Sequence, residues 1–165
     1  TVVHRPDLGV VGPHEQTICV TPSAEGEYRT SRATLQFVTP LRLQQNGHAL
    51  PPEKLDARIL LMALVRRASL LSEFHGNGPL ISDFSALLTA SAEVRDEKRL
   101  KWRDWTRYSS RQQQRMALGG VVGEWTIEGP LDVFYPYLQL GRWLHVGKEA
   151  AFGLGQYRLA TGNDT

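Results

Sequence analysis

The sequence predicts an α+β protein with a ferredoxin-like fold, in which a four-stranded antiparallel sheet carries two helices on one face. Stretches in which every second residue is apolar predict strands, and stretches in which apolar residues recur every three or four positions predict helices. Along the chain these stretches follow the order β-α-β-β-α-β. The chain has 165 residues, which is enough for one domain to bury a core without disulfide or metal support.

The first half of this fold is a strand, a turn and a helix. Alternating apolar residues predict a strand over residues 33–43, with a kink at Pro40 because proline cannot donate to the ladder. The dipeptide Asn46-Gly47 predicts a tight turn. A helix is expected over residues 54–74, where apolar residues recur at helical spacing. These residues are Leu55, Ile59, Met62, Ala63, Leu70 and Phe74.

The second half is a hairpin of two long strands, a helix and a last strand. The two strands are expected over residues 92–110 and 116–128, joined by a turn or a disordered tip. A helix is expected over residues 131–146, with Asp132 in its first turn, where the helix dipole favours an acid. The last strand is expected over residues 156–160. The expected buried face of the helix is Phe134, Tyr137, Leu138, Gly141 and Leu144.

The remaining segments carry weaker patterns. Residues 1–32 are expected to form an N-terminal extension or linker with a short strand at 16–20, and residues 33–165 to form the ferredoxin-like domain. Residues 83–90 are expected to add a short helix or a turn. The chain begins with Thr1, so it is expected to be processed or to be the C-terminal part of a longer protein.

Composition limits the class of protein. A single cysteine, Cys19, excludes an internal disulfide framework and favours a reducing compartment, so a cytoplasmic protein is expected. No apolar run reaches membrane-spanning length and no signal-peptide pattern opens the chain, so no membrane partner is expected. The histidines at positions 4, 14, 48 and 75 show no metal-ligand spacing, so no metal is expected.

Positive charge is concentrated in one segment. Residues 95–115 hold eight basic and three acidic residues, a net charge of +5, which leaves −3 for the rest of a chain whose total is +2. Such a concentration indicates a polyanionic partner, and the planar guanidinium of arginine suits phosphate contacts. The alternative is a solvated hairpin without a partner.

A glycine-rich stretch with a lysine precedes the last strand. Residues 145–157 contain Gly147, Gly153 and Gly155, and Lys148 follows the first of them. Glycine lets a backbone approach a ligand closely, and consecutive free N–H groups form an anion-binding concavity. The pattern indicates a phosphate ligand. The alternative is a tight connection between a helix and a strand.

The common nucleotide motifs do not fit this stretch. Gly141 and Gly147 are separated by five residues rather than four, and Glu149 stands where a Walker loop needs a hydroxyl. A dinucleotide fingerprint needs a third glycine opening a helix, whereas position 158 is Arg158 in an expected strand. No nucleotide cofactor is therefore expected.

Five blocks in a fixed order resemble a known family. They are residues 37–43, Arg66-Arg67, residues 102–111, residues 119–123 and residues 145–157. Together they resemble the C-terminal half of the CRISPR-associated repeat endoribonucleases (the Cas-six group of the RAMP superfamily), over about residues 33–160. The glycine-rich loop is that superfamily's hallmark.

The resemblance implies a function and a domain organisation. It implies two tandem ferredoxin-like domains in the full protein and metal-independent cleavage of CRISPR precursor RNA within its repeats, through attack of a 2′-hydroxyl on the adjacent phosphate. Members usually place the catalytic histidine in the N-terminal domain, and only one such domain fits in this chain. We therefore expect the RNA-binding half of an endoribonuclease, inactive by itself and without a cofactor.

Two groups of residues are candidates for RNA contact. The loop group is Gly147, Lys148, Gly153 and Gly155, and the hairpin group is Arg107, Tyr108, Arg111 and Arg115. His145 is a candidate catalytic group, and the alternative for it is a cation stabilised by a helix C-terminus. Trp102, Trp105 and Trp125 are expected in the core rather than as base-stacking platforms.

Two other functions remain open. The chain could be a non-catalytic RAMP subunit that binds guide RNA in a CRISPR effector complex, with other subunits of that complex as partners. It could also be a ferredoxin-like domain whose glycine-rich loop is only a connector.

Overall fold

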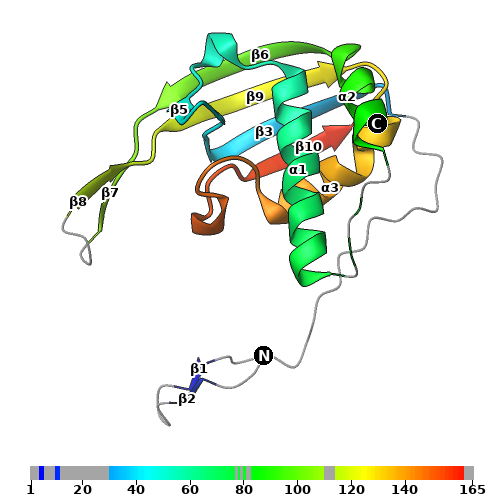
Figure 1. Cartoon of the computed structure of the whole chain (residues 1–165). Coiled ribbons are helices and arrows are strands. Elements are labelled where there is room, and N and C mark those ends of the chain that lie inside the picture. The colour runs from blue at the N-terminus through cyan, green and yellow to red at the C-terminus, as the bar shows by residue number, and fades with distance from the viewer. Residues whose placement is uncertain are drawn as a thin grey trace.

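Four strands form the central antiparallel sheet, in the order β10-β3-β9-β6 (Figure 1). The computed structural model describes residues 4–5, 10–11, 30–76, 78, 80, 83–109 and 114–161. The strands are β3 (Arg32–Leu41), β6 (Arg95–Arg103), β9 (Gly120–Glu128) and β10 (Tyr157–Thr161). β3 and β9 are the central strands, because each connection through a helix passes over one strand of the sheet. This arrangement confirms the predicted ferredoxin-like fold.

Three helices lie on one face of this sheet (Figure 1). They are α1 (Ala57–His75), α2 (Phe84–Ala92) and α3 (Tyr135–Leu144). Carboxylates begin two of them. The Asp56 side chain accepts a hydrogen bond from Ile59 N at 2.7 Å, and the Asp83 side chain accepts one from Ala86 N at 2.9 Å. Each of these carboxylates satisfies a first-turn amide that has no partner inside its helix. The cap at Asp83 therefore favours a helix rather than a turn at α2.

Short elements precede the sheet or connect its strands and helices. The pair β1 (His4–Arg5) with β2 (Val10–Val11) comes before β3 in the chain. The connecting elements are the pair β4 (Gln44–Gln45) with β5 (His48–Ala49) and the 3₁₀ turns η1 (Pro52–Lys54), η2 (Asp132–Phe134) and η3 (Ala150–Phe152). Asn46 and Gly47 join β4 to β5 with φ of 51° and 80°, as a tight hairpin turn requires. The strand predicted at 16–20, with Cys19, lies outside the described residues.

The apolar residues that predicted α1 are buried to different degrees. Ile59, Met62 and Ala63 pack against the core, whereas Phe74 is 74% exposed and Leu70 is 44% exposed. The buried residues of α1 are Ala57, Leu60, Leu61, Leu64, Val65 and Ala68. Apolar residues occupy most positions of this helix, so spacing alone does not select one face. Packing on α3 and the sheet selects it, and the C-terminal part of α1 projects past the sheet (Figure 1).

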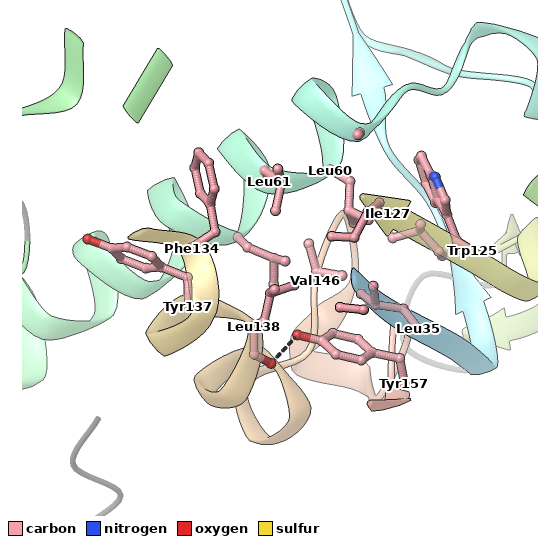
Figure 2. Close-up of a cluster of buried hydrophobic side chains, with 14 of the residues drawn as sticks. Leu35, Leu60, Leu61, Trp125, Ile127, Phe134, Tyr137, Leu138, Val146 and Tyr157 are labelled. Atoms are coloured by element: carbon pink, nitrogen blue, oxygen red, sulfur yellow. Dashed lines mark hydrogen bonds between the residues drawn. The ribbon is translucent and has the colours of Figure 1, made fainter. Parts of the chain in front are cut away.

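The core lies between the sheet and the helices (Figure 2). Trp125 on β9 is fully buried, and its indole N–H donates to Asp96 Oδ2 at 2.7 Å. Tyr157 on β10 donates its hydroxyl to Leu138 O on α3 at 2.6 Å (Figure 2). Burial raises the pKa of the Tyr157 hydroxyl well above its usual range, so it stays a neutral donor. The first contact joins β9 to β6, and the second orients β10 against α3.

The predicted hairpin of two long strands is broken in both strands. β6 ends at Arg103 and the chain resumes as β7 (Thr106–Ser109). The return runs through β8 (Gln114–Ala117) before β9. β7 and β8 pair with each other only and extend beyond the sheet (Figure 1). At the break, Trp102 and Trp105 are 40% and 47% exposed, so the prediction that they lie in the core is wrong.

The structure confirms the buried face predicted for the helix after β9. Phe134 and Leu138 are fully buried, Tyr137 and Gly141 are buried, and Leu144 is half-buried. Within the described residues, no helix has the length and apolar character needed to cross a bilayer.

Gly141 is a direct test of the packing between α3, α1 and β10. A Cβ at this position would lie 2.2 Å from Tyr157 Oη and 2.4 Å from Leu64 Cδ2. Gly141→Ala should therefore destabilise the protein by about 1 to 2 kcal/mol, because overpacking outweighs the gain in helix propensity. Urea unfolding measures the loss. Glu73→Ala on the exposed side of α1 is the control and should change stability by less than about 0.5 kcal/mol. An equal or higher stability of the Gly141 variant would contradict this packing.

Candidate nucleic-acid interface

Four strand ends meet at one end of the sheet. Leu41 on β3, Val121 on β9 and Trp102 on β6 lie side by side in register, and β10 begins beside β3. The β4–β5 turn, the β7–β8 hairpin and the loop between α3 and β10 all extend from this end, which we call the loop end of the sheet (Figure 1). The glycine-rich and arginine-rich segments of the sequence therefore lie at the same end of the molecule.

The glycine-rich loop is held against the end of β3 by backbone hydrogen bonds. Gly155 N donates to Pro40 O at 2.9 Å and Lys148 N donates to Arg42 O at 2.7 Å. The Thr39 hydroxyl accepts from Gln156 N and donates to Gly153 O, both at 2.8 Å. The loop is thus a folded part of the sheet end.

The loop does not present a continuous row of free amides, contrary to the sequence-based interpretation. The N–H groups of Phe152, Gly153 and Leu154 donate to carbonyls within the loop itself, in addition to the contacts with β3. The amides that take no part in these hydrogen bonds are those of Gly147, Glu149, Ala150 and Ala151. A phosphate would therefore meet only part of the predicted concavity.

Two of the loop glycines are required by close backbone approach. A Cβ on Gly155 would lie 1.8 Å from Val146 O, and one on Gly147 would lie 2.6 Å from Arg42 O. Gly153 has open space around it and a φ of 88°, so only its backbone conformation favours glycine. The connector function of the loop thus accounts for its glycines, while a role in RNA contact stays a prediction.

Lys148 is the cationic side chain of this loop. Its side chain is 56% exposed, and Nζ lies 3.7 Å from Glu149 Oε1. The Glu149 side chain is only 17% exposed, but the separation is long and the Lys148 ammonium stays hydrated, so the ion pair contributes little free energy. The Lys148 ammonium is therefore available to a phosphate.

His145 ends α3 in a strained backbone conformation. Its φ of 58° and ψ of 173° fall in a region that is almost reserved for glycine. Burial and the nearby Arg67 guanidinium lower the pKa of the imidazole, against a smaller opposing effect of a hydrogen bond with the Ala150 backbone. The neutral form is thus favoured, which argues against a cation at the helix C-terminus. The catalytic assignment of His145 stays a prediction.

The hairpin candidates lie on paired strands beyond the sheet. Arg107 is opposite Met116, and Tyr108 is opposite Arg115. Arg111 lies outside the described residues. The backbone therefore places three of the four predicted hairpin contacts on β7 and β8.

Arg42 connects the loop to the base of the hairpin, and the sequence reasoning did not select it. Its carbonyl accepts from Lys148 N, and its guanidinium Nη1 donates to Gly119 O at 3.4 Å, just before β9. Charge could not identify Arg42, because it lies far from the basic segment in sequence. Its position at the end of β3 makes it a shared anchor for both candidate elements.

The helix-free face of the sheet lacks aromatic side chains. Its central positions are Thr34, Gln36, Glu124 and Thr126, and ion pairs such as Arg32–Glu128 flank them. Sheets that bind RNA on an open face stack bases on aromatic side chains, so this face is not of that type. Within the described ranges, no group of three or more His, Cys, Asp or Glu side chains could hold a metal ion.

Comparisons with known proteins place these features in a family. The family model for the CRISPR-associated endoribonuclease Cas6 matches residues 35–157. No curated protein matches the chain in a sequence search.

Solved structures share the fold. Thermus thermophilus Cas6 is 15% identical with a TM-score of 0.62, over 79% of this chain and 54% of that protein. A Cas6 product complex is 23% identical with a TM-score of 0.55, over 82% of this chain and 53% of that one. A chain of a partial Cas6-RT-Cas1–Cas2 complex is 14% identical with a TM-score of 0.55, over 86% of this chain and 24% of that one. The present chain thus spans about half the length of the first two Cas6 structures.

The loop glycines provide a matched pair of substitutions. Gly155→Ala should destabilise the protein by about 2 to 3 kcal/mol, because the new Cβ meets the Val146 carbonyl. Gly153→Ala should cost only about 1 kcal/mol, because its Cβ meets nothing and only the positive φ is unfavourable. Denaturant unfolding of both variants measures the difference. Equal losses would mean that the loop is not closed onto β3 as described.

Proposed function

The chain belongs to the Cas6 family of CRISPR-associated endoribonucleases, and on that basis we propose that it is the C-terminal RNA-binding domain of an enzyme that cuts CRISPR precursor RNA within its repeats. The match of the family model to residues 35–157 is the observation that carries the proposal. The two segments that bind RNA in this proposal are the glycine-rich loop and the β7–β8 hairpin.

The geometry of the loop end supports RNA binding by these two segments together. Lys148 is exposed on one of them, and Arg107 and Arg115 lie on the other. Arg42, at the end of β3, hydrogen-bonds to the backbone of the loop at Lys148 and to the backbone at the base of the hairpin at Gly119. Neutralising several phosphates of one RNA releases their counterions, so cations on neighbouring segments add to the affinity. A basic hairpin beside a loop of this kind suits the paired and unpaired parts of a repeat stem-loop.

A second ferredoxin-like domain is part of the proposal. The chain spans about half of the Cas6 structures that it resembles, so we infer that an N-terminal ferredoxin-like domain precedes residues 33–165 in the full protein, with residues 1–32 as the linker. Similar structures include a Cas6 substrate-mimic complex and a partial Cas6-RT-Cas1–Cas2 complex. Repeat RNA and other CRISPR proteins are accordingly the proposed partners.

The proposed reaction needs no metal. A 2′-hydroxyl oxygen attacks the adjacent phosphorus, the bond from phosphorus to the 5′-oxygen breaks, and the departing 5′-oxygen takes up a proton. The step needs a base, an acid and a cation for the developing charge on the phosphoryl oxygens. Lys148 is the proposed cation from this chain, and His145 remains a candidate for proton transfer. The main catalytic group is assigned to the N-terminal domain, so the chain alone should bind RNA without cutting it.

Phosphate contacts predict salt-dependent RNA binding. Lys148→Ala and the double variant Arg107→Ala with Arg111→Ala should each weaken binding of a CRISPR repeat RNA by roughly tenfold at low salt and reduce the slope of log K against log salt by about one per lost contact. Fluorescence anisotropy over a salt titration measures both quantities. Arg66→Ala, an exposed arginine on α1, is the control and should leave both unchanged. Unchanged affinities of the loop and hairpin variants across the titration would refute the proposed interface.

Metal removal separates the endoribonuclease from a binding subunit. The full-length protein should cut repeat RNA at one site in the presence of EDTA, because the 2′-hydroxyl mechanism uses side chains only. The products should carry a 2′,3′-cyclic phosphate or its opened form, which mass spectrometry identifies. Tight binding without cleavage, with or without added Mg²⁺, would instead favour a RAMP subunit that only holds guide RNA.

A further inference from the structure

Two large aromatic side chains are open to solvent at the base of the β7–β8 hairpin. Trp102 is 40% exposed and Trp105 is 47% exposed. Trp102 lies beside Val121 and Leu41 in one row on the helix-covered face of the sheet, and these two neighbours are buried. The row thus ends in an indole that lies next to buried residues and is open to solvent.

The Trp102 ring is held in place within the chain. Its indole N–H donates to Asp104 Oδ1 at 2.8 Å. The backbone of Gly119 packs closely against it, since a Cβ at Gly119 would lie 3.1 Å from both Cζ2 and Nε1 of the ring. A ring that is already ordered loses little entropy when a flat partner stacks on its open part.

A cation lies near Trp102. The Arg42 guanidinium donates to the carbonyl of Gly119, the residue that packs against the ring. Lys101 and Arg103, the exposed neighbours of Trp102 on β6, alternate to the helix-free face at the same strand end. The Arg42 carbonyl also accepts from Lys148 N, so the indole belongs to the same loop end as the glycine-rich loop. An exposed aromatic ring at a basic strand end is an arrangement that single-stranded RNA-binding sites use.

We propose that Trp102 is a stacking platform for one unpaired base of the RNA bound at the loop end of the sheet. The inference rests on the proposed function and adds a contact to a base, where Lys148 and the hairpin arginines contact phosphates. The helix-free face of the sheet offers no aromatic surface for this purpose, so the base is held on the other face, at the junction of β6 and β7. Trp105, three residues further on, lies at the same junction.

Paired substitutions separate stacking from packing. Trp102→Leu keeps apolar bulk and removes the aromatic face, whereas Trp102→Phe keeps a ring. In the full-length protein with a repeat RNA that carries a stem-loop and single-stranded flanks, Trp102→Leu should weaken binding about tenfold, and Trp102→Phe less than about threefold. Phe84→Leu on α2, where Phe84 is 49% exposed, is the control and should not change affinity. Thermal unfolding of each variant checks that the fold is intact.

Two further readouts are specific to a stacked base. In Trp102→Leu, the slope of log K against log salt should equal the wild-type slope, because no phosphate contact is lost. One abasic position in the RNA should weaken the wild type about tenfold and leave Trp102→Leu unchanged, as expected for two halves of one contact.

The outcomes also separate this inference from the proposed function. Equal affinity of Trp102→Leu and wild type, together with weaker binding by Lys148→Ala, would overturn the stacking contact and leave the RNA-binding function standing. A second contrary result is that Trp102→Leu and Trp102→Phe lose the same affinity with every RNA, whichever position is abasic. That result would assign Trp102 to packing and likewise overturn the inference. A wild-type protein that binds no repeat RNA would overturn both.

Discussion

The connection from α3 to β10 must close over the end of β3, and the rest of the structure depends on that closure. β10 is an edge strand that pairs with β3 alone, so its position is set by the loop that delivers it. Hydrogen bonds to Pro40 O, Arg42 O and the Thr39 hydroxyl hold the loop, and the absence of a side chain at Gly155 allows the approach. Tyr157 then ties the strand back to α3.

This closure changes what the glycine-rich loop can offer to a ligand. A loop whose amides were free could bind phosphate through its backbone. Here many of those amides satisfy the fold, because an unpaired buried N–H is costly. In the proposed function, ligand binding is thereby left mainly to side chains of the closed loop and of the hairpin. Recognition by cations is electrostatic and carries little base specificity, so a contact to a base must come from another residue. Trp102 is an exposed aromatic ring at this end whose indole N–H is held by Asp104.

The fold was predictable because it depends on periodicity, and the site was less so because it depends on long-range contacts. Alternation and helical spacing are local properties, and they located the sheet strands and α3 correctly. The spacing of apolar residues in α1 did not select a buried face, because leucine occupies several faces and only packing selects one. The exposure of Trp102 was missed because the change of phase at Trp105 does not distinguish a strand that leaves its sheet from a bulge within it. Arg42 was missed because its role arises from two contacts with segments about 80 and 100 residues away in the chain.

The backbone strain at His145 has a structural explanation that does not require a catalytic role. Backbone strain at a candidate site costs about 1 to 3 kcal/mol and often accompanies catalysis. In this chain, however, the strained residue also has a local structural role, because its side chain interacts with the Ala150 backbone and so links the end of α3 to η3. Burial and the Arg67 guanidinium lower the pKa of the imidazole, whereas the hydrogen bond with the Ala150 backbone opposes them. The strain at His145 therefore has a structural explanation in the turn from α3 into the closed loop, and in the proposed function the catalytic base is more simply assigned to the N-terminal domain.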